Sequence, residues 1–177
     1  MLERMNVLVG IGGGIAAYKA PELVRALGRR GHAVRCVPTA SALRLVTAEA
    51  LAAVARQPVS TTLWTSDGSM PHIDLARWAD LVLVAPATAD LLARFALGLA
   101  DDLLATVFLA LEPGKRVLIA PAMNTQMWLK PVVQGHAAAL RATGARLLDP
   151  VPGNLACGEQ GIGAMVDIEV IAAAVDG

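Results

Sequence analysis

Two short segments of the sequence, 121–128 and 156–165, carry residue types that a packing element does not need. In the first, an asparagine lies among methionines after an apolar run, and in the second a cysteine stands next to glycine. The apolar run 117–120 ends at Pro121, which has no N–H for a strand ladder, so Asn124 follows the carboxyl end of a strand. Open α/β sheets bind ligands at that edge. An amide and a thiol can bind a polar substrate and transfer a proton, and we predict that both segments belong to one active site.

A glycine-rich turn near the start of the sequence is typical of a phosphate-binding loop. Four of the five residues in 10–14 are glycine, between an expected strand and an expected helix. Backbone N–H groups and the helix dipole attract a phosphate there, although a tight turn that packs a helix on a sheet explains the same glycines. Ile15 replaces the third glycine of the dinucleotide fingerprint and no carboxylate follows the second strand, so a mononucleotide such as FMN fits better than NAD.

Hydrophobic periodicity predicts alternating strands and helices, and therefore an α/β fold. The expected strands cover 7–10, 33–37, 81–85, 117–120 and 146–149, and the expected helices cover 15–29, 42–56, 88–98, 101–110, 131–143 and the chain from Ile168 onward. Short apolar strands between helices indicate a mostly parallel sheet flanked by helices, in a single Rossmann-like (flavodoxin-like) domain over 1–177. The stretches 57–74 and 150–166 are expected to be irregular and functional.

Composition narrows the class of protein further. Fifteen basic and fifteen acidic side chains cancel, and without a basic run we expect no nucleic-acid partner and no membrane partner. No apolar run is long enough for a transmembrane helix, and Glu3 together with the glycine turn argues against a secretory signal. We therefore expect a cytoplasmic protein in which Cys36 and Cys157 stay reduced. No motif predicts a metal site.

Several motifs in order along the chain point to one family. They are Gly-Gly-Ile-Ala-Ala-Tyr-Lys at 13–19, His-Ile-Asp-Leu-Ala-Arg-Trp-Ala-Asp at 72–80, Ala-Pro-Ala-Thr-Ala-Asp at 85–90, and the two segments described first. Together they resemble the flavin-containing cysteine decarboxylases, whose members act on phosphopantothenoylcysteine in coenzyme A synthesis or on peptidyl cysteine in modified-peptide biosynthesis. The resemblance covers nearly the whole chain and implies FMN as the cofactor.

The resemblance also implies a role for each residue that matches a family motif. His72 would be the catalytic histidine, Asn124 would hold the substrate carboxylate, and Cys157 would donate a proton in the reductive half-reaction. The implied FMN contacts are Gly13, Gly14, Ile15, Ser41, Thr88, Ala89 and Ala122, and the implied substrate contacts are Asn124, Met127, Ala156 and Gly158. Family members form trimers or trimer-based dodecamers with flavin at subunit contacts, which implies a homo-oligomer here.

The chemistry of cysteine decarboxylation explains why such residues are needed. Direct loss of CO₂ would leave an unstabilised carbanion at Cα, so an electron sink has to be made first. Oxidation of the thiol to a thioaldehyde by the flavin allows the Cα–carboxylate bond to break into a conjugated enethiolate. The protein then needs a base, a group that positions the carboxylate and, for a reductive ending, an acid.

Each candidate residue also has a purely structural reading. His72 follows Pro71 and suits a surface or capping position. Asn124 is a good helix N-cap, and Met127 would be a core residue by default. Asp90 is acceptor-only and would repel a phosphate close to it, so we expect that it is not a cofactor ligand.

The resemblance leaves the substrate open. The motif around Cys157 favours phosphopantothenoylcysteine, which we place ahead, because peptide decarboxylases can stop at the enethiol and commonly lack this cysteine. Many bacterial members are fused to a synthetase, and the lack of one in these 177 residues favours the alternative, a precursor peptide with a C-terminal cysteine. Two other classes are disfavoured: a non-catalytic regulatory flavoprotein, by the retention of His72, Asn124 and Cys157, and a nicotinamide-dependent reductase, by the missing acidic residue.

Overall fold

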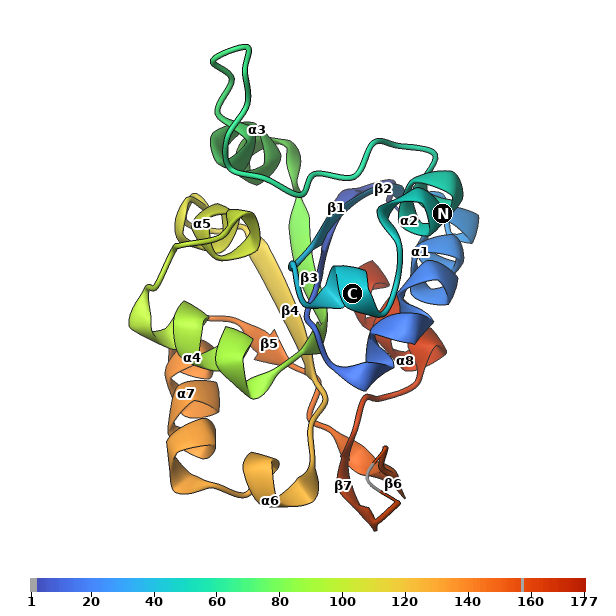
Figure 1. Ribbon diagram of the computed structural model, residues 1–177, viewed down its shortest axis with the longest axis vertical. Coiled ribbons are helices and arrows are strands. Elements are labelled where there is room, and N and C mark those ends of the chain that lie inside the picture. Colours follow the sequence, from blue (N-terminus) through green and yellow to red (C-terminus); the bar gives the residue numbers. More distant parts are fainter. Residues whose placement is uncertain (1–2, 157) are drawn as a thin grey trace.

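The computed structural model describes residues 3–156 and 158–177 and contains a five-stranded parallel sheet (Figure 1). Its strands are β1 (Asn6–Ile11), β2 (Ala33–Pro38), β3 (Leu81–Ala87), β4 (Arg116–Pro121) and β5 (Arg146–Leu147), in the order β2-β1-β3-β4-β5. The chain adds β2 on one side of β1 and β3 on the other, and a crevice for ligands opens at such a switch point. The predicted α/β fold with a mostly parallel sheet is confirmed.

Helices cover both faces of the sheet (Figure 1). On one face lie α1 (Ala20–Arg29), α2 (Ala48–Ala55) and α8 (Ile168–Asp176), and on the other lie α3 (Pro71–Trp78), α4 (Ala89–Leu97), α5 (Leu103–Leu109) and α7 (Pro131–Ala142). Because successive side chains of a strand point to opposite faces, Val7 and Val9 join the core under the first group while Leu8 joins the second. None of the helices described is long and apolar enough to cross a membrane.

Two helices that we expected to be continuous are divided. The short 3-10 helices η1 (Ile15–Lys19) and η2 (Ala42–Arg44) precede α1 and α2, respectively. Helix α1 begins beside Pro21, whose missing N–H costs nothing in a first turn. Helix α2 begins after Thr47, because the threonine hydroxyl accepts a hydrogen bond from the Ala50 amide at 3.1 Å.

The stretch 150–166 contains an antiparallel hairpin, so our expectation of an irregular segment is wrong there. Its strands are β6 (Val151–Asn154) and β7 (Gln160–Ala164). Most of the hairpin is exposed, and its glycines and proline carry no strand propensity, so periodicity could not reveal it. The stretch 57–74, which we also expected to be irregular, is irregular over 57–70, and α3 begins at Pro71.

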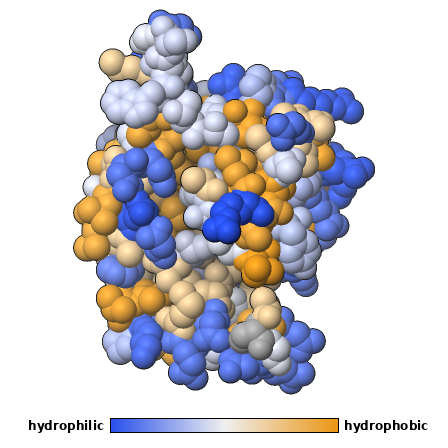
Figure 2. Space-filling model, viewed as in Figure 1, coloured by the Kyte–Doolittle hydropathy of each residue, from blue (hydrophilic) through white to orange (hydrophobic). Residues whose placement is uncertain are grey.

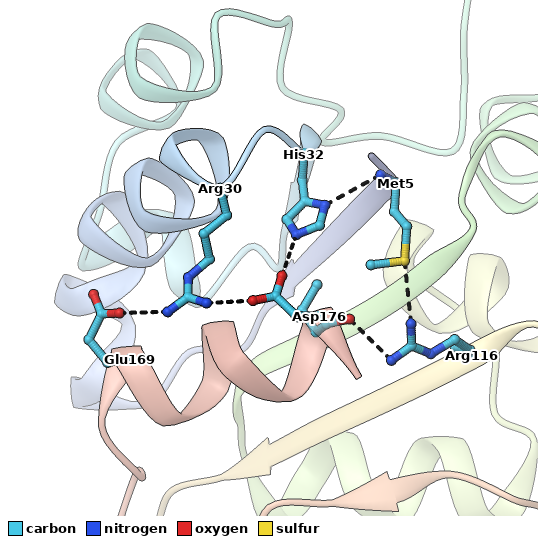
Figure 3. Close-up of polar contacts among 7 residues, drawn as sticks. Met5, Arg30, His32, Arg116, Glu169 and Asp176 are labelled. Atoms are coloured by element: carbon cyan, nitrogen blue, oxygen red, sulfur yellow. Dashed lines mark hydrogen bonds and ion pairs between the residues drawn. The ribbon is translucent and has the colours of Figure 1, made fainter. Parts of the chain in front are cut away.

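Helix α8 is anchored at its end by a buried polar contact (Figure 3). The His32 side chain is fully buried; its Nδ1 accepts a hydrogen bond from the Met5 amide at 3.3 Å, which leaves Nε2 to contact Asp176 Oδ1 at 2.9 Å. Arg30 donates to the second oxygen of Asp176 and also reaches Glu169. Three elements distant in sequence are thereby tied together at the amino-terminal end of β1.

Replacing Asp176 by asparagine is expected to lower the free energy of unfolding by about 1–2 kcal/mol at neutral pH, because two charge-assisted contacts weaken. Burial alone would raise the pKa of Asp176, but the hydrogen bonds from His32 and Arg30 outweigh it and the pKa is lowered. A carboxyl group with a lowered folded-state pKa stabilises the fold above its unfolded pKa, and this contribution is lost as the pH falls through the folded value. Urea unfolding should therefore show a gap between wild type and variant at pH 7 that closes in acid. The exposed Asp167, changed to asparagine, is the control, and a gap independent of pH would contradict the assignment.

Candidate active site

Loops from the carboxyl ends of the first four strands meet at one edge of the sheet. They contain Gly12–Gly14 after β1, Thr39–Ser41 after β2, Thr88 after β3 and Ala122 after β4. Backbone hydrogen bonds join neighbouring loops: the Gly12 amide donates to the Pro86 carbonyl at 2.9 Å, and the Ala122 amide donates to the Ala87 carbonyl at 3.0 Å. Five predicted FMN contacts from four separate loops, namely Gly13, Gly14, Ser41, Thr88 and Ala122, are thus brought to one edge of the sheet.

The glycine loop approaches its neighbours closely. A Cβ on Gly13 would lie 2.2 Å from the Ser41 Cβ and 2.9 Å from the Ser41 carbonyl carbon, so only glycine allows these two loops to touch. At Gly14 a Cβ would lie 3.5 Å from Thr88 Cγ2 and 3.8 Å from the Ala122 carbonyl oxygen, which is ordinary contact. The loop therefore forms a backbone cradle beside Ser41 and Thr88.

A cavity of about 490 Å³ opens at this cradle. Among its lining residues are the predicted site residues Gly13, Ser41, Thr88, Ala89 and Met127. The Ile15 side chain is exposed, with 58% of its surface accessible. A larger cavity, of about 730 Å³, is lined by Arg25, Arg29, His32 and other residues of α1, α2 and β2, and because it contains no predicted site residue we place the chemistry at the smaller one.

Asp90 lines the smaller cavity, but its charge is paired. Arg94, one helical turn further on, donates to Asp90 Oδ2 at 2.8 Å, and its other end contacts Asp101. The Thr88 hydroxyl caps the same helix by accepting from the Leu91 amide at 3.3 Å. The pair with Arg94 offsets the repulsion that Asp90 would exert on a phosphate.

Asn124 is oriented by contacts on both sides of its amide. It is the N-cap of α6 (Thr125–Trp128), where Oδ1 accepts a hydrogen bond from the Gln126 amide at 2.8 Å. The structural reading of Asn124 as a cap is therefore confirmed. Its Nδ2 donates to Glu159 Oε2 at 3.1 Å, so the donor side of the amide faces away from the helix, toward the end of the hairpin.

Glycines of β7 allow the hairpin to press against the Asn124 segment. A Cβ on Gly163 would lie 2.1 Å from the Met123 carbonyl oxygen, and a Cβ on Gly161 would lie 2.3 Å from Thr125 Oγ1. The Met123 amide donates to the Gly163 carbonyl at 3.0 Å. The two segments that attracted attention in the sequence are thus in direct contact.

The remaining predicted substrate contacts lie around this hairpin. Met127 is 46% exposed at the cavity, and Ala156 and Gly158 are exposed in the loop between β6 and β7. Cys157, the predicted proton donor, lies outside the described residues.

His72 is not brought to Asn124 within one chain. It lies in the first turn of α3, and Figure 1 places α3 and α6 at opposite ends of the sheet. Its Nδ1 is buried, and among the described residues no hydrogen-bond partner reaches it. The two described members of the predicted catalytic set, His72 and Asn124, therefore lie at the amino-terminal and carboxyl-terminal ends of the strands, respectively.

Comparison with known proteins assigns the chain to a family. The family model described as Flavoprotein matches residues 1–177. The chain belongs to this flavoprotein family. Within it, the chain is 49% identical over 167 residues to the coenzyme A biosynthesis bifunctional protein CoaBC of Mycobacterium tuberculosis, covering 94% of this chain and 39% of the relative. The corresponding protein of Vibrio cholerae is 46% identical over 174 residues, with 97% and 43% covered. The chain thus spans about two fifths of the length of these curated relatives.

Two solved structures match this chain over nearly their whole length. A cysteine-to-serine mutant of PPC decarboxylase, complexed with pantothenoylaminoethenethiol, superimposes with a TM-score of 0.90 at 33% identity, covering 98% of this chain and 97% of that one. The FMN-dependent cysteine decarboxylase SpaF superimposes with a TM-score of 0.83 at 34% identity, covering 99% and 97%. The predicted resemblance to flavin-containing cysteine decarboxylases is confirmed.

One polar residue beside Asn124 escaped sequence reasoning. Glu159 contacts Asn124 although 35 positions separate them. Its only sequence signal was its place two residues after Cys157 in a glycine-rich loop. Periodicity cannot predict such a contact, because it depends on how the hairpin packs against α6.

Proposed function

We propose that this chain catalyses the FMN-dependent decarboxylation of 4′-phosphopantothenoylcysteine, a step of coenzyme A biosynthesis, and that 1–177 form a single flavoprotein decarboxylase domain. The observation that carries the proposal is the match to a PPC decarboxylase over 97% of that chain. The proposal concerns this one activity, because the bifunctional relatives extend well beyond the aligned part.

FMN fits the residues at the carboxyl edge of the sheet. The backbone cradle at Gly13 and Gly14 is suited to a phosphate, because the loop leads into helix η1 and its two glycines have no side chains of their own to cover their amides. The Ser41 hydroxyl is a further donor in the same cavity, and Thr88, Ala89 and Ala122 would lie along the ring. When bound, FMN supplies the two-electron acceptor for oxidation of the substrate thiol to a thioaldehyde, from which the carboxylate departs as CO₂.

The protein's own groups would bind and orient the substrate around that step. The Asn124 amide, held by its cap, presents Nδ2 to the substrate carboxylate and fixes the Cα–carboxylate bond. His72 would accept the thiol proton. Cys157 would supply the proton to carbon in the reductive ending, in which the two electrons held by reduced FMN would return to the enethiol as hydride. The product would then be a saturated thiol, and the whole reaction would be redox-neutral.

A homo-oligomer would complete the site, because α3, which contains His72, and α6, which Asn124 caps, lie at opposite ends of the sheet (Figure 1). On the face shown in Figure 2, hydrophobic surface gathers along the edge over α4 and α5, where Leu97, Leu99 and Leu109 are each more than half exposed. Exposed apolar surface of this kind is typical of subunit interfaces. A homotrimer or a trimer-based dodecamer would bring His72 of one subunit to Asn124 of another.

Mixing two inactive variants tests this shared site. His72→Ala and Asn124→Asp are each expected to be inactive alone, whereas oligomers unfolded and refolded together should regain activity. With random assembly, about a quarter of the sites would combine an intact His72 with an intact Asn124. Decarboxylation would be measured as CO₂ release, with each variant refolded alone as control. No recovery in oligomers that contain both variants would show that the site is not shared.

The function itself is tested by assaying two substrates side by side. Purified holoprotein should be yellow and should release CO₂ from phosphopantothenoylcysteine, with mass spectrometry showing the saturated thiol. If CO₂ is released only from a peptide that ends in cysteine, the substrate is the alternative, a precursor peptide with a C-terminal cysteine. The similarity to the cysteine decarboxylase SpaF supports that alternative. A yellow protein that decarboxylates neither would be a regulatory flavoprotein, and a colourless one unable to bind FMN would overturn the proposal.

A further inference from the structure

The contact between Asn124 and Glu159 places a carboxylate of the protein where the proposed function places the carboxylate of the substrate. Glu159 Oε2 accepts from Asn124 Nδ2 at 3.1 Å. The opposite end of the amide is held by the Gln126 N–H at 2.8 Å, so Asn124 cannot turn its donor elsewhere without losing the helix cap. The contact is thus the same kind of amide–carboxylate interaction that binding of the substrate carboxylate would need.

The position of Glu159 is set by the backbone around it. The Leu155 amide donates to the Glu159 carbonyl at 2.8 Å, which closes the loop between β6 and β7. The next residue, Gln160, pairs with Asn154 at the start of the β6–β7 ladder. Further along β7, the Met123 amide donates to the Gly163 carbonyl at 3.0 Å. The hairpin is therefore fixed to the Asn124 segment, and it presents Glu159 to the amide.

We propose that Glu159 is a specificity-determining residue: its carboxylate competes with the substrate carboxylate for the Asn124 amide donor. This inference rests on the proposed function, because it takes the substrate to be a carboxylate. Glu159 orients the amide and disfavours weakly bound anions beside it. After displacement it stays close to the incoming carboxylate, since the hairpin holds its backbone, and like charges repel. Glu159 therefore lowers the affinity of the site for ligands that carry the carboxylate and leaves other ligands unaffected.

Glu159→Gln is the discriminating variant. Glutamine keeps an oxygen acceptor for Asn124 at the same reach but removes the charge. The ligands are two unreactive analogues of whichever substrate the wild-type enzyme proves to decarboxylate. In the first, serine replaces cysteine. In the second, ethanolamine replaces cysteine, so that it differs from the first only by lacking the carboxylate. Binding to the holoenzyme would be followed by the flavin absorbance, which also reports that the variant is folded and loaded. The exposed Glu112, changed to glutamine, is the matched control.

Glu159→Gln is expected to tighten binding of the serine analogue about three- to tenfold, a modest change because Glu159 is exposed and its charge is partly screened. The ethanolamine analogue should bind with unchanged affinity, and the gain for the serine analogue should shrink at high salt. Equal changes for both ligands, or no change for either, would overturn the role of Glu159 while leaving the decarboxylase proposal intact. If the wild-type enzyme decarboxylates neither candidate substrate, the proposed function fails, and this inference fails with it.

Discussion

Asn124→Asp is expected to abolish CO₂ release while the protein keeps its flavin. The new side chain retains an oxygen for the Gln126 amide, so the cap of α6 survives. Its second oxygen replaces the Nδ2 donor and faces both Glu159 and the incoming carboxylate. Juxtaposed like charges cost several kcal/mol, and a loss of ~4 kcal/mol would lower turnover about a thousandfold.

The measurement combines CO₂ release under saturating and limiting substrate with the absorbance spectrum of the bound flavin. Asn154, an exposed asparagine of β6, provides a matched control, because Asn154→Asp makes the same substitution on the neighbouring hairpin without touching the proposed carboxylate site. Its activity should stay close to that of wild type. Unchanged turnover in Asn124→Asp would refute the role of Asn124, and loss of the flavin would mean that the substitution acts on cofactor binding instead.

Gly13→Ala is expected to produce a folded protein that binds FMN poorly. The added Cβ would lie 2.2 Å from the Ser41 Cβ and 2.9 Å from the Ser41 carbonyl carbon, so the loops after β1 and β2 would have to separate. Overpacking of this kind costs about 1–3 kcal/mol. If the cost falls on the cofactor site, FMN affinity drops about 10- to 100-fold. Flavin fluorescence titration of the apoprotein would measure it.

Gly28→Ala is the control for the alanine substitution itself. Gly28 lies in α1, and nothing stands within 4 Å of the Cβ that it would acquire. Alanine is favoured over glycine inside a helix by up to about 1 kcal/mol, so this variant should be slightly more stable and should bind FMN normally. Normal FMN affinity in Gly13→Ala, with unchanged stability toward urea, would show that the close approach to Ser41 does not shape the cofactor site.

Much of the fold could be predicted because its elements are encoded locally. The strands at 7–10, 81–85 and 117–120 are apolar runs that are largely buried, which is the pattern of a central parallel strand. The segment 33–37 contains Arg35 and forms the edge strand β2, where alternate residues are only half-buried. Asn124 was located because Pro121 ends a strand. The hairpin at 151–164 was missed because exposed strands rich in glycine give no local signal in the sequence.

The sequence by itself determined the alternation of strands and helices, the glycine turn and the family motifs, because residues close together in the chain produce each of them. Only the tertiary structure decided which residues meet. It brought Gly13 against Ser41 and Asn124 against Glu159, and it left His72 at the other end of the sheet. These outcomes depend on strand order and on the packing of the hairpin against α6, which arise from many weak contacts between distant segments and leave no pattern in any one of them.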